Sequence, residues 1–225
     1  MAGRRLRLLG RLAGVAGPAA FTAAWATSSL LQTGHAATEV QISGLAAPDA
    51  RDPWIMITGF LVLGCCSVVF GAALHRTLGG SGQAGWAGRA GDGPRLIQAA
   101  GLLTVAAGLL RRDRMLLTAP AHESWHNHAH DVVSALIYVA LIAAPLLLAR
   151  RFRGDPWWAP LCWPLVGASL ATAAVLVVFF TGAFGSWAGP LQRIGVSVPL
   201  AAVCAVAARL LAAGGGPRPG GERGR

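Results

Sequence analysis

The chain consists of long apolar runs separated by short polar connections. Six runs approach or exceed the length of about 20 mainly apolar residues that a helix needs to cross a bilayer. They cover residues 12–32, 54–78, 95–117, 131–149, 157–184 and 193–211. The pattern therefore predicts an all-α membrane bundle, residues 12–212, with six transmembrane helices.

The segments outside these runs are basic or rich in glycine. Residues 1–11 contain four arginines and are predicted to form a basic cytoplasmic N-terminus. A basic start before an apolar run also resembles a signal peptide, but this run is longer than a usual signal core, so we expect no cleavage. Residues 213–225, which include GGGPRPGGERGR, are predicted to be a disordered cytoplasmic tail.

Composition and charge support the membrane class and suggest an orientation. Hydrophobic residues make up 54% of the chain and charged residues 12%, about half the charged fraction of a typical soluble domain. The net charge is +10, yet the arginines flank the apolar runs, so we expect membrane lipids and no nucleic acid as partners. The expected location is the cell membrane, crossed several times.

The orientation follows from the distribution of arginine, the only basic residue type apart from histidine. If both termini are cytoplasmic, fourteen of the 19 arginines lie on the cytoplasmic side. Basic residues concentrate on that side in membrane proteins, so N-in/C-in is favoured. The segment Arg111-Arg112-Asp113-Arg114 opposes this assignment, because it lies on the predicted outer side.

Polar residues collect in the sequence AHESWHNHAHDVVSALIY, residues 121–138. In a helix, His126, His130 and Tyr138 would recur at multiples of four residues and share one face. His126 and His130 could together bind a divalent metal such as zinc if a third ligand were nearby. Asp131 could instead work with a histidine in acid–base chemistry. A purely structural polar cluster is the third interpretation, and the sequence leaves all three open.

A second polar group precedes the last apolar run, at Gln192 and Arg193. Arg193 lies where a helix would enter the bilayer from outside. Its guanidinium could reach Asp131 or bind a lipid phosphate, because arginine forms bidentate bonds to both kinds of anion. The alternative is that Arg193 extends to the headgroup region without a specific partner.

Several of these segments, in this order, resemble a bacterial integral membrane family catalogued as domain of unknown function 998. The similar stretches are SSLLQT (28–33), QISGLAA (41–47), DPWIMITGFLVLG (52–64), HNHAHD (126–131) and GPLQRIG (189–195). The resemblance spans about residues 10–212. It implies a six-helix bundle and directs attention to five positions: His126, His130, Asp131, Gln192 and Arg193. It supplies no activity.

The leading functional hypothesis is an enzyme of the outer membrane face that acts on a lipid or isoprenoid, by hydrolysis or cyclisation. The catalytic candidates are Asp131, His126 and His130. The substrate-binding candidates are Arg193, Gln192, Asp113 and Tyr138. In the cyclase version, Asp131 protonates a polyene in a pocket lined by Trp125, Phe180, Phe184 and Trp187.

The alternative is a non-catalytic lipid-binding, sensory or assembly protein whose polar cap is structural. A transporter ranks third, because transporters place ionisable groups near the membrane midplane, and the centres of these runs hold no Asp, Glu, Lys or Arg.

Overall fold

The computed structural model describes residues 2–34, 36–79, 92–116 and 123–212, and these form an all-α structure. The described residues contain six long helices: α1 (Ala2–Leu31), α2 (Pro53–Gly79), α4 (Asp92–Leu109), α5 (Trp125–Phe152), α6 (Cys162–Phe180) and α7 (Ala188–Ala212). Three short 3-10 helices lie in the connections: η1 (Ser43–Ala46), η2 (Ala159–Leu161) and η3 (Gly185–Trp187). The predicted disordered tail, residues 213–225, lies outside the described residues.

The helix boundaries differ from the predicted spans at several ends. The basic segment 1–11 is helical from Ala2 and continues into α1. Helix α5 begins six residues before the predicted span, so its first two turns carry the histidine-rich sequence. Helix α4 ends at Leu109 and α6 at Phe180, both earlier than predicted. The charged segment Arg111–Arg114 follows α4, and Gly182, with a positive φ of 67°, follows α6.

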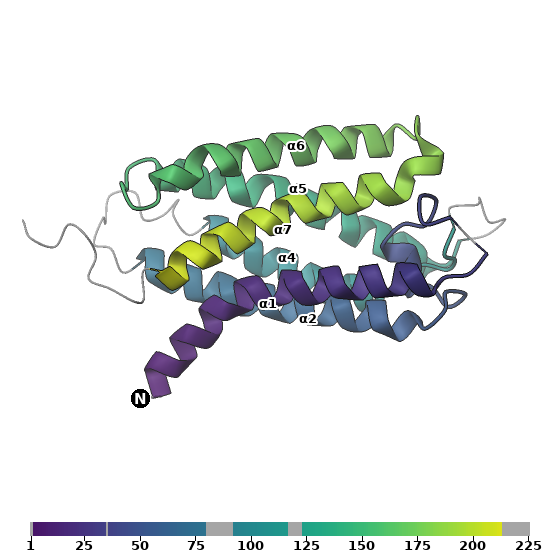
Figure 1. Cartoon of the computed structure of the whole chain (residues 1–225), viewed down its shortest axis with the longest axis horizontal. Helices are drawn as coiled ribbons and strands as arrows, with labels where there is room; N and C mark the ends of the chain where they lie inside the picture. The colour runs from purple at the N-terminus through teal and green to yellow at the C-terminus, as the bar shows by residue number, and fades with distance from the viewer. Residues whose placement is uncertain (1, 35, 80–91, 117–122, 213–225) are drawn as a thin grey trace, which may run out of the picture.

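The six helices run side by side along the long axis of the molecule (Figure 1). Each packs against the next in chain order, and α7 returns to pack against α1, which closes a ring. The start of α1 and the end of α7 therefore lie at the same end of the bundle (Figure 1). We call this the basic end; the other end, formed by residues 32–34, 36–52, 110–116, 123–124 and 181–187, is the loop end.

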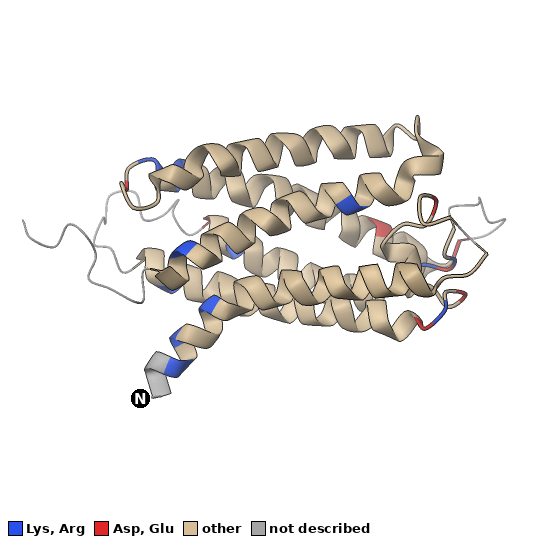
Figure 2. Cartoon of the chain, viewed as in Figure 1, with Lys and Arg blue, Asp and Glu red and all other residues tan. Residues whose placement is uncertain are grey.

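Charged residues gather at the two ends of this axis. Figure 2 shows most of the acidic residues at the loop end and arginines at both ends, with few charged residues along the middle of the bundle. Four helices are long and apolar enough to cross a membrane: α2, α5, α6 with η2, and α7 with η3. The protein is therefore a multi-pass membrane protein. Helices α1 and α4 do not reach the same criteria of length and hydropathy.

Glycine allows a close backbone contact between α2 and α4. A methyl group built on Gly64 would lie 2.6 Å from the carbonyl oxygen of Gly101, and one on Gly101 would lie 2.6 Å from the carbonyl oxygen of Gly64. Contacts of this kind are typical of helix pairs in membranes, where packing rather than the hydrophobic effect holds helices together.

We predict that Gly101→Ala destabilises the protein, because the new methyl group would press against the backbone of α2. Overpacking of this kind costs about 1–3 kcal/mol. The measurement is the apparent melting temperature of the purified protein in detergent. Gly167→Ala is the matched control, since no atom lies within 4 Å of a methyl group there. Equal melting of the two variants would contradict the close contact.

Candidate functional site

The segment of residues 36–50, here the 36–50 loop, is inserted into the loop end of the bundle. Every residue from Val40 to Ala47 is buried. These side chains pack with Phe21 of α1, with Met56 of α2 and with other core residues. A buried segment that is not a regular helix needs partners for its backbone polar groups, so the side chains around it are constrained.

Gln192 of α7 supplies one of these partners and also contacts α5. Its Oε1 accepts a hydrogen bond from the backbone N–H of Ile42 at 2.6 Å, which fixes the orientation of the amide. The Nε2 therefore faces the opposite way and donates to the Tyr138 hydroxyl oxygen at 2.8 Å. Because that oxygen accepts, the Tyr138 O–H remains a donor, and no acceptor for it occurs among the described residues.

Arg193 anchors the beginning of the same loop. Its guanidinium donates to the Ala37 carbonyl at 2.7 Å and to the Ser29 hydroxyl at 3.0 Å, and it lies 5.5 Å from the centre of the Trp25 ring. The adjacent backbone N–H of Gly189 donates to the Thr38 carbonyl at 2.8 Å. Arg193 thus joins α7 to α1 and the 36–50 loop.

His130 joins α5 to the end of α4. Its Nδ1 lies 3.1 Å from the Ala107 carbonyl and 2.6 Å from the Leu110 carbonyl. Carbonyl oxygens only accept, so Nδ1 carries the hydrogen and donates to carbonyls that the end of α4 leaves unpaired. The residue is 2% exposed, and Nε2 has no partner among the described residues.

Asp113 fixes the start of α5. Its carboxylate accepts hydrogen bonds from the backbone N–H of Ser124 at 2.7 Å and from the Ser124 hydroxyl. The Ser124 side chain in turn caps the helix by accepting from the Asn127 N–H. The two bonds from Ser124, that from the hydroxyl foremost, lower the pKa of Asp113, because they stabilise its charged form.

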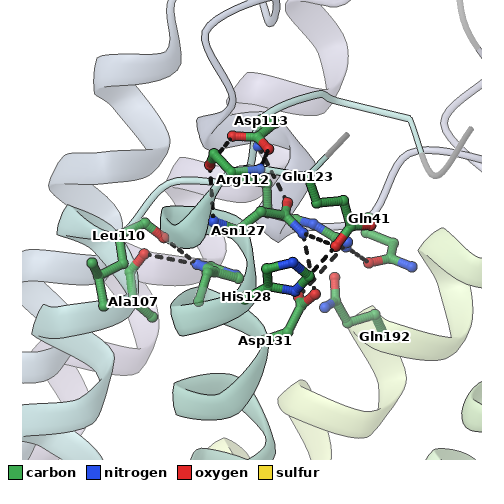
Figure 3. Close-up of polar contacts among 12 residues, drawn as sticks. Gln41, Ala107, Leu110, Arg112, Asp113, Glu123, Asn127, His128, Asp131 and Gln192 are labelled. Atoms are coloured by element: carbon green, nitrogen blue, oxygen red, sulfur yellow. Dashed lines mark hydrogen bonds and ion pairs between the residues drawn. The ribbon is translucent and has the colours of Figure 1, made fainter. Parts of the chain in front are cut away.

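Asp131 forms an ion pair with Arg112 rather than with Arg193. The Arg112 Nη2 lies 3.7 Å from Asp131 Oδ1, and Nη1 donates to Gln41 Oε1 at 3.0 Å. Asn127 bridges Asp131 and Glu123 through its Nδ2. Figure 3 shows these side chains converging from α5, the 36–50 loop and the segment after α4. The Asp131 side chain is 48% exposed, so its ion pair is accessible.

His126 and His128 lie on the exposed side of α5. The His126 ring stacks on Trp125, with 3.8 Å between ring centres, and His128 lies 3.4 Å from Glu123. His130 faces α4, so the histidine pair proposed from the sequence does not converge. No group of three metal-ligating side chains occurs among the described residues. The geometry gives no support to a zinc site here.

Two adjoining cavities lie beside this polar group. The outer one has a volume of about 610 Å³ and the inner one about 50 Å³. Both are lined by Ser43, His130, Ser134, Tyr138 and Gln192. The outer cavity is also lined by the Arg112–Asp131 pair and by Phe179, Phe180 and Phe184. Trp125 and Trp187 do not line either cavity.

The family assignment agrees with this architecture. The model of the family described as a protein of unknown function, DUF998, matches residues 15–209. The chain belongs to this family. The match confirms the resemblance inferred from the sequence and contains every candidate site residue. No curated protein and no solved structure matches the chain.

The structure brings some of the DUF998 candidates together and separates others. His130, Asp131, Tyr138 and Gln192 line the outer cavity, whereas His126, Asp113 and Arg193 do not. Sequence reasoning did not propose Gln41, Ser43 or Arg112 for the site. The sequence did contain an indication for Arg112: it belongs to the basic segment Arg111–Arg114, which is unusual on the predicted outer side. Gln41 and Ser43 lie in QISGLAA, but nothing in that sequence indicates that the loop turns inward.

We predict that Asp113→Asn lowers the melting temperature at neutral pH, because the neutral amide caps Ser124 less well. The lowered pKa sets the sign of the pH dependence. Stabilisation by the carboxylate is present above its unfolded pKa of about 3.9 and is lost as the pH falls through the lower folded value. The melting difference between wild type and variant should therefore shrink in acid.

Glu39→Gln is the control for this series, because the Glu39 carboxylate has no partner among the described residues. Its melting temperature should follow that of the wild type at every pH. A constant difference between wild type and Asp113→Asn down to strongly acidic pH would contradict the proposed role of the carboxylate.

Proposed function

We propose that this protein binds an amphiphilic molecule, a lipid or an isoprenoid, in the outer cavity. The observation that carries the proposal is the mixed lining of that cavity. Arg112, Asp131 and Gln41 provide polar groups, and Phe179, Phe180 and Phe184 provide an aromatic wall. Ligand sites commonly have volumes of about 300–1,000 Å³, and this cavity is of that size.

The aromatic wall suggests how a ligand would enter. Phe180 and Phe184 line the cavity, and yet they are 64% and 56% exposed. The cavity therefore reaches the surface near the end of α6, a helix long and apolar enough to cross a membrane. A lipid chain could pass between this wall and the surrounding bilayer without crossing water, which favours a ligand drawn from the membrane.

We place the loop end, and with it the cavity, at the outer face of the bacterial cell membrane. This orientation is N-in/C-in with six crossings, so α1 and α4 also span. Two arguments support it: the start of α1 and the end of α7 both lie at the basic end, and basic residues concentrate on the cytoplasmic side of membrane proteins.

Catalysis on the bound lipid is the second candidate. It is favoured by the unpartnered Nε2 of His130, which belongs to a residue lining the cavity next to Asp131. These two residues could exchange protons with a substrate during hydrolysis or cyclisation. His126 is exposed and outside the cavity, so it is the weakest of the three catalytic candidates.

A purely structural role explains only part of the cluster. Asp113, Asn127 and Arg193 bond to protein groups and have no position in the cavity wall. His130 and Tyr138, which line the cavity, are different: each has a hydrogen-bonding group, Nε2 and O–H respectively, without a partner among the described residues. This division favours binding over a polar cap that only fixes the helices.

We predict that Ala135→Phe reduces the lipid bound to the purified protein several-fold. Ala135 lines the outer cavity and is exposed, so a larger side chain should fill the cavity without disturbing the helix core. Native mass spectrometry from detergent measures the bound lipid. The control is Val139→Phe, one turn further along α5, which is 63% exposed and lines neither cavity. Unchanged binding in both variants would refute the assigned site.

We predict that a single cysteine at position 186 reacts with a membrane-impermeant maleimide in intact cells. A cysteine at position 154, at the basic end, should react only after lysis. Both positions are exposed, and the native cysteines 65, 66, 162 and 204 are first replaced by alanine. The opposite labelling would reverse the orientation, and labelling of both in intact cells would exclude this topology.

A further inference from the structure

His130 lines both cavities, and its Nε2 is a buried atom without a hydrogen-bond partner among the described residues. Its Nδ1–H is occupied by the carbonyls of Ala107 and Leu110. The two ring nitrogens point to different sides, so Nε2 faces away from α4. Both Nδ1 partners are uncharged and the ring is 2% exposed, conditions that suit the neutral imidazole, whose Nε2 is a lone-pair acceptor.

The charges in the cavity wall argue against a strongly charged ligand. Within the part of the chain that the structure describes, Arg112 and Asp131 are the only ionised residues that line the outer cavity, and they pair with each other at 3.7 Å. An anionic headgroup would have to compete with Asp131 for Arg112. Arg193, which also lies near this end, binds Ala37 and Ser29 and does not line the cavity.

From these two observations we infer that the cavity selects a long-chain alcohol whose hydroxyl donates to His130 Nε2. The inference rests on the proposed binding function and names its ligand class. A buried acceptor left without a donor is unfavourable, so a ligand that supplies the hydrogen gains affinity over one that cannot. The oxygens of an ionised phosphate ester are mainly hydrogen-bond acceptors, so they match the Nε2 acceptor poorly. A hydroxyl group can donate a hydrogen to Nε2.

The rest of the cavity suits the same molecule. Tyr138 lines both cavities and has an O–H free to donate, so it can provide a second contact to oxygen. The apolar chain would then extend along Phe180 and Phe184 toward the surface. A water molecule could also satisfy His130, and the experiment separates these two sources of a hydroxyl group.

The experiment is a competition for the purified full chain between farnesol and its methyl ether at equal concentration. Native mass spectrometry measures the ratio of the two bound species. The ether keeps the chain and the oxygen but lacks the hydrogen. For the wild type we expect farnesol to be preferred about five- to tenfold, the worth of one hydrogen bond. Equal binding would overturn the inference, as expected if water fills the position.

His130→Asn is the matched variant. The asparagine Nδ2 takes the place of Nδ1 and can still donate to the end of α4, while the Nε2 acceptor is lost. For His130→Asn we expect the ratio of bound farnesol to bound methyl ether to fall close to one, with little change in melting temperature. A preference that persists in the folded variant would overturn the assignment to His130. If the variant fails to fold, the wild-type ratio still decides.

Farnesyl phosphate is the third ligand, and it tests the charge argument. We expect it to bind less well than farnesol, and tighter binding would overturn the inference in favour of an anionic ligand. Failure of the binding function itself gives a different result. In that case farnesol and the ether both fail to bind, or both bind equally to wild type and Ala135→Phe.

Discussion

The loop end of this protein is governed by the need to satisfy backbone polar groups away from water. The 36–50 loop enters the bundle without forming a long helix, so its N–H and C=O groups require partners from other elements. Gln192 and Arg193 of α7 provide two of them, at Ile42 and Ala37, and Asp49 accepts in return from the Met115 N–H. The loop, the start of α7 and the segment after α4 are thereby held as one unit. The outer cavity takes its shape from that unit.

Helix packing explains why a cavity forms at this position. The ring of helices is closed by neighbours in chain order, and the glycine contact between α2 and α4 draws that side of the bundle tightly together. Helices α5 and α7 are not neighbours in the ring, and the Tyr138–Gln192 hydrogen bond joins them at the loop end. Space therefore remains between them, and the small residues Ser43, Ser134 and Ala135 do not fill it.

The polar residues of the loop end do two different kinds of work. One set closes helix ends and loops: Asp113 with Ser124 at the start of α5, Nδ1 of His130 at the end of α4, and Arg193 at the 36–50 loop. The other set borders the cavity and keeps unused or exchangeable hydrogen-bonding capacity, as in Tyr138 and the Arg112–Asp131 pair. His130 belongs to both sets, because one ring nitrogen caps a helix and the other is free. A single substitution of His130 therefore tests stability and ligand selection together unless the cap is preserved.

The sequence by itself determined the class, the family and the number of long helices. Burial of some 20 apolar residues per run admits few alternatives in a membrane, and arginine placement gives an orientation that stays a prediction. It also located the polar residues near one end of the bundle, including His130, Asp131, Tyr138 and Gln192. The tertiary structure decided which of them share a cavity. It turned His126 outward and His130 inward although they are one turn apart, because α4 ends beside His130 and presents unpaired carbonyls there. It paired Asp131 with Arg112 instead of Arg193, because the 36–50 loop occupies the guanidinium of Arg193. Spacing along one helix cannot reveal these choices, because they depend on where the ends of other helices and loops come to lie.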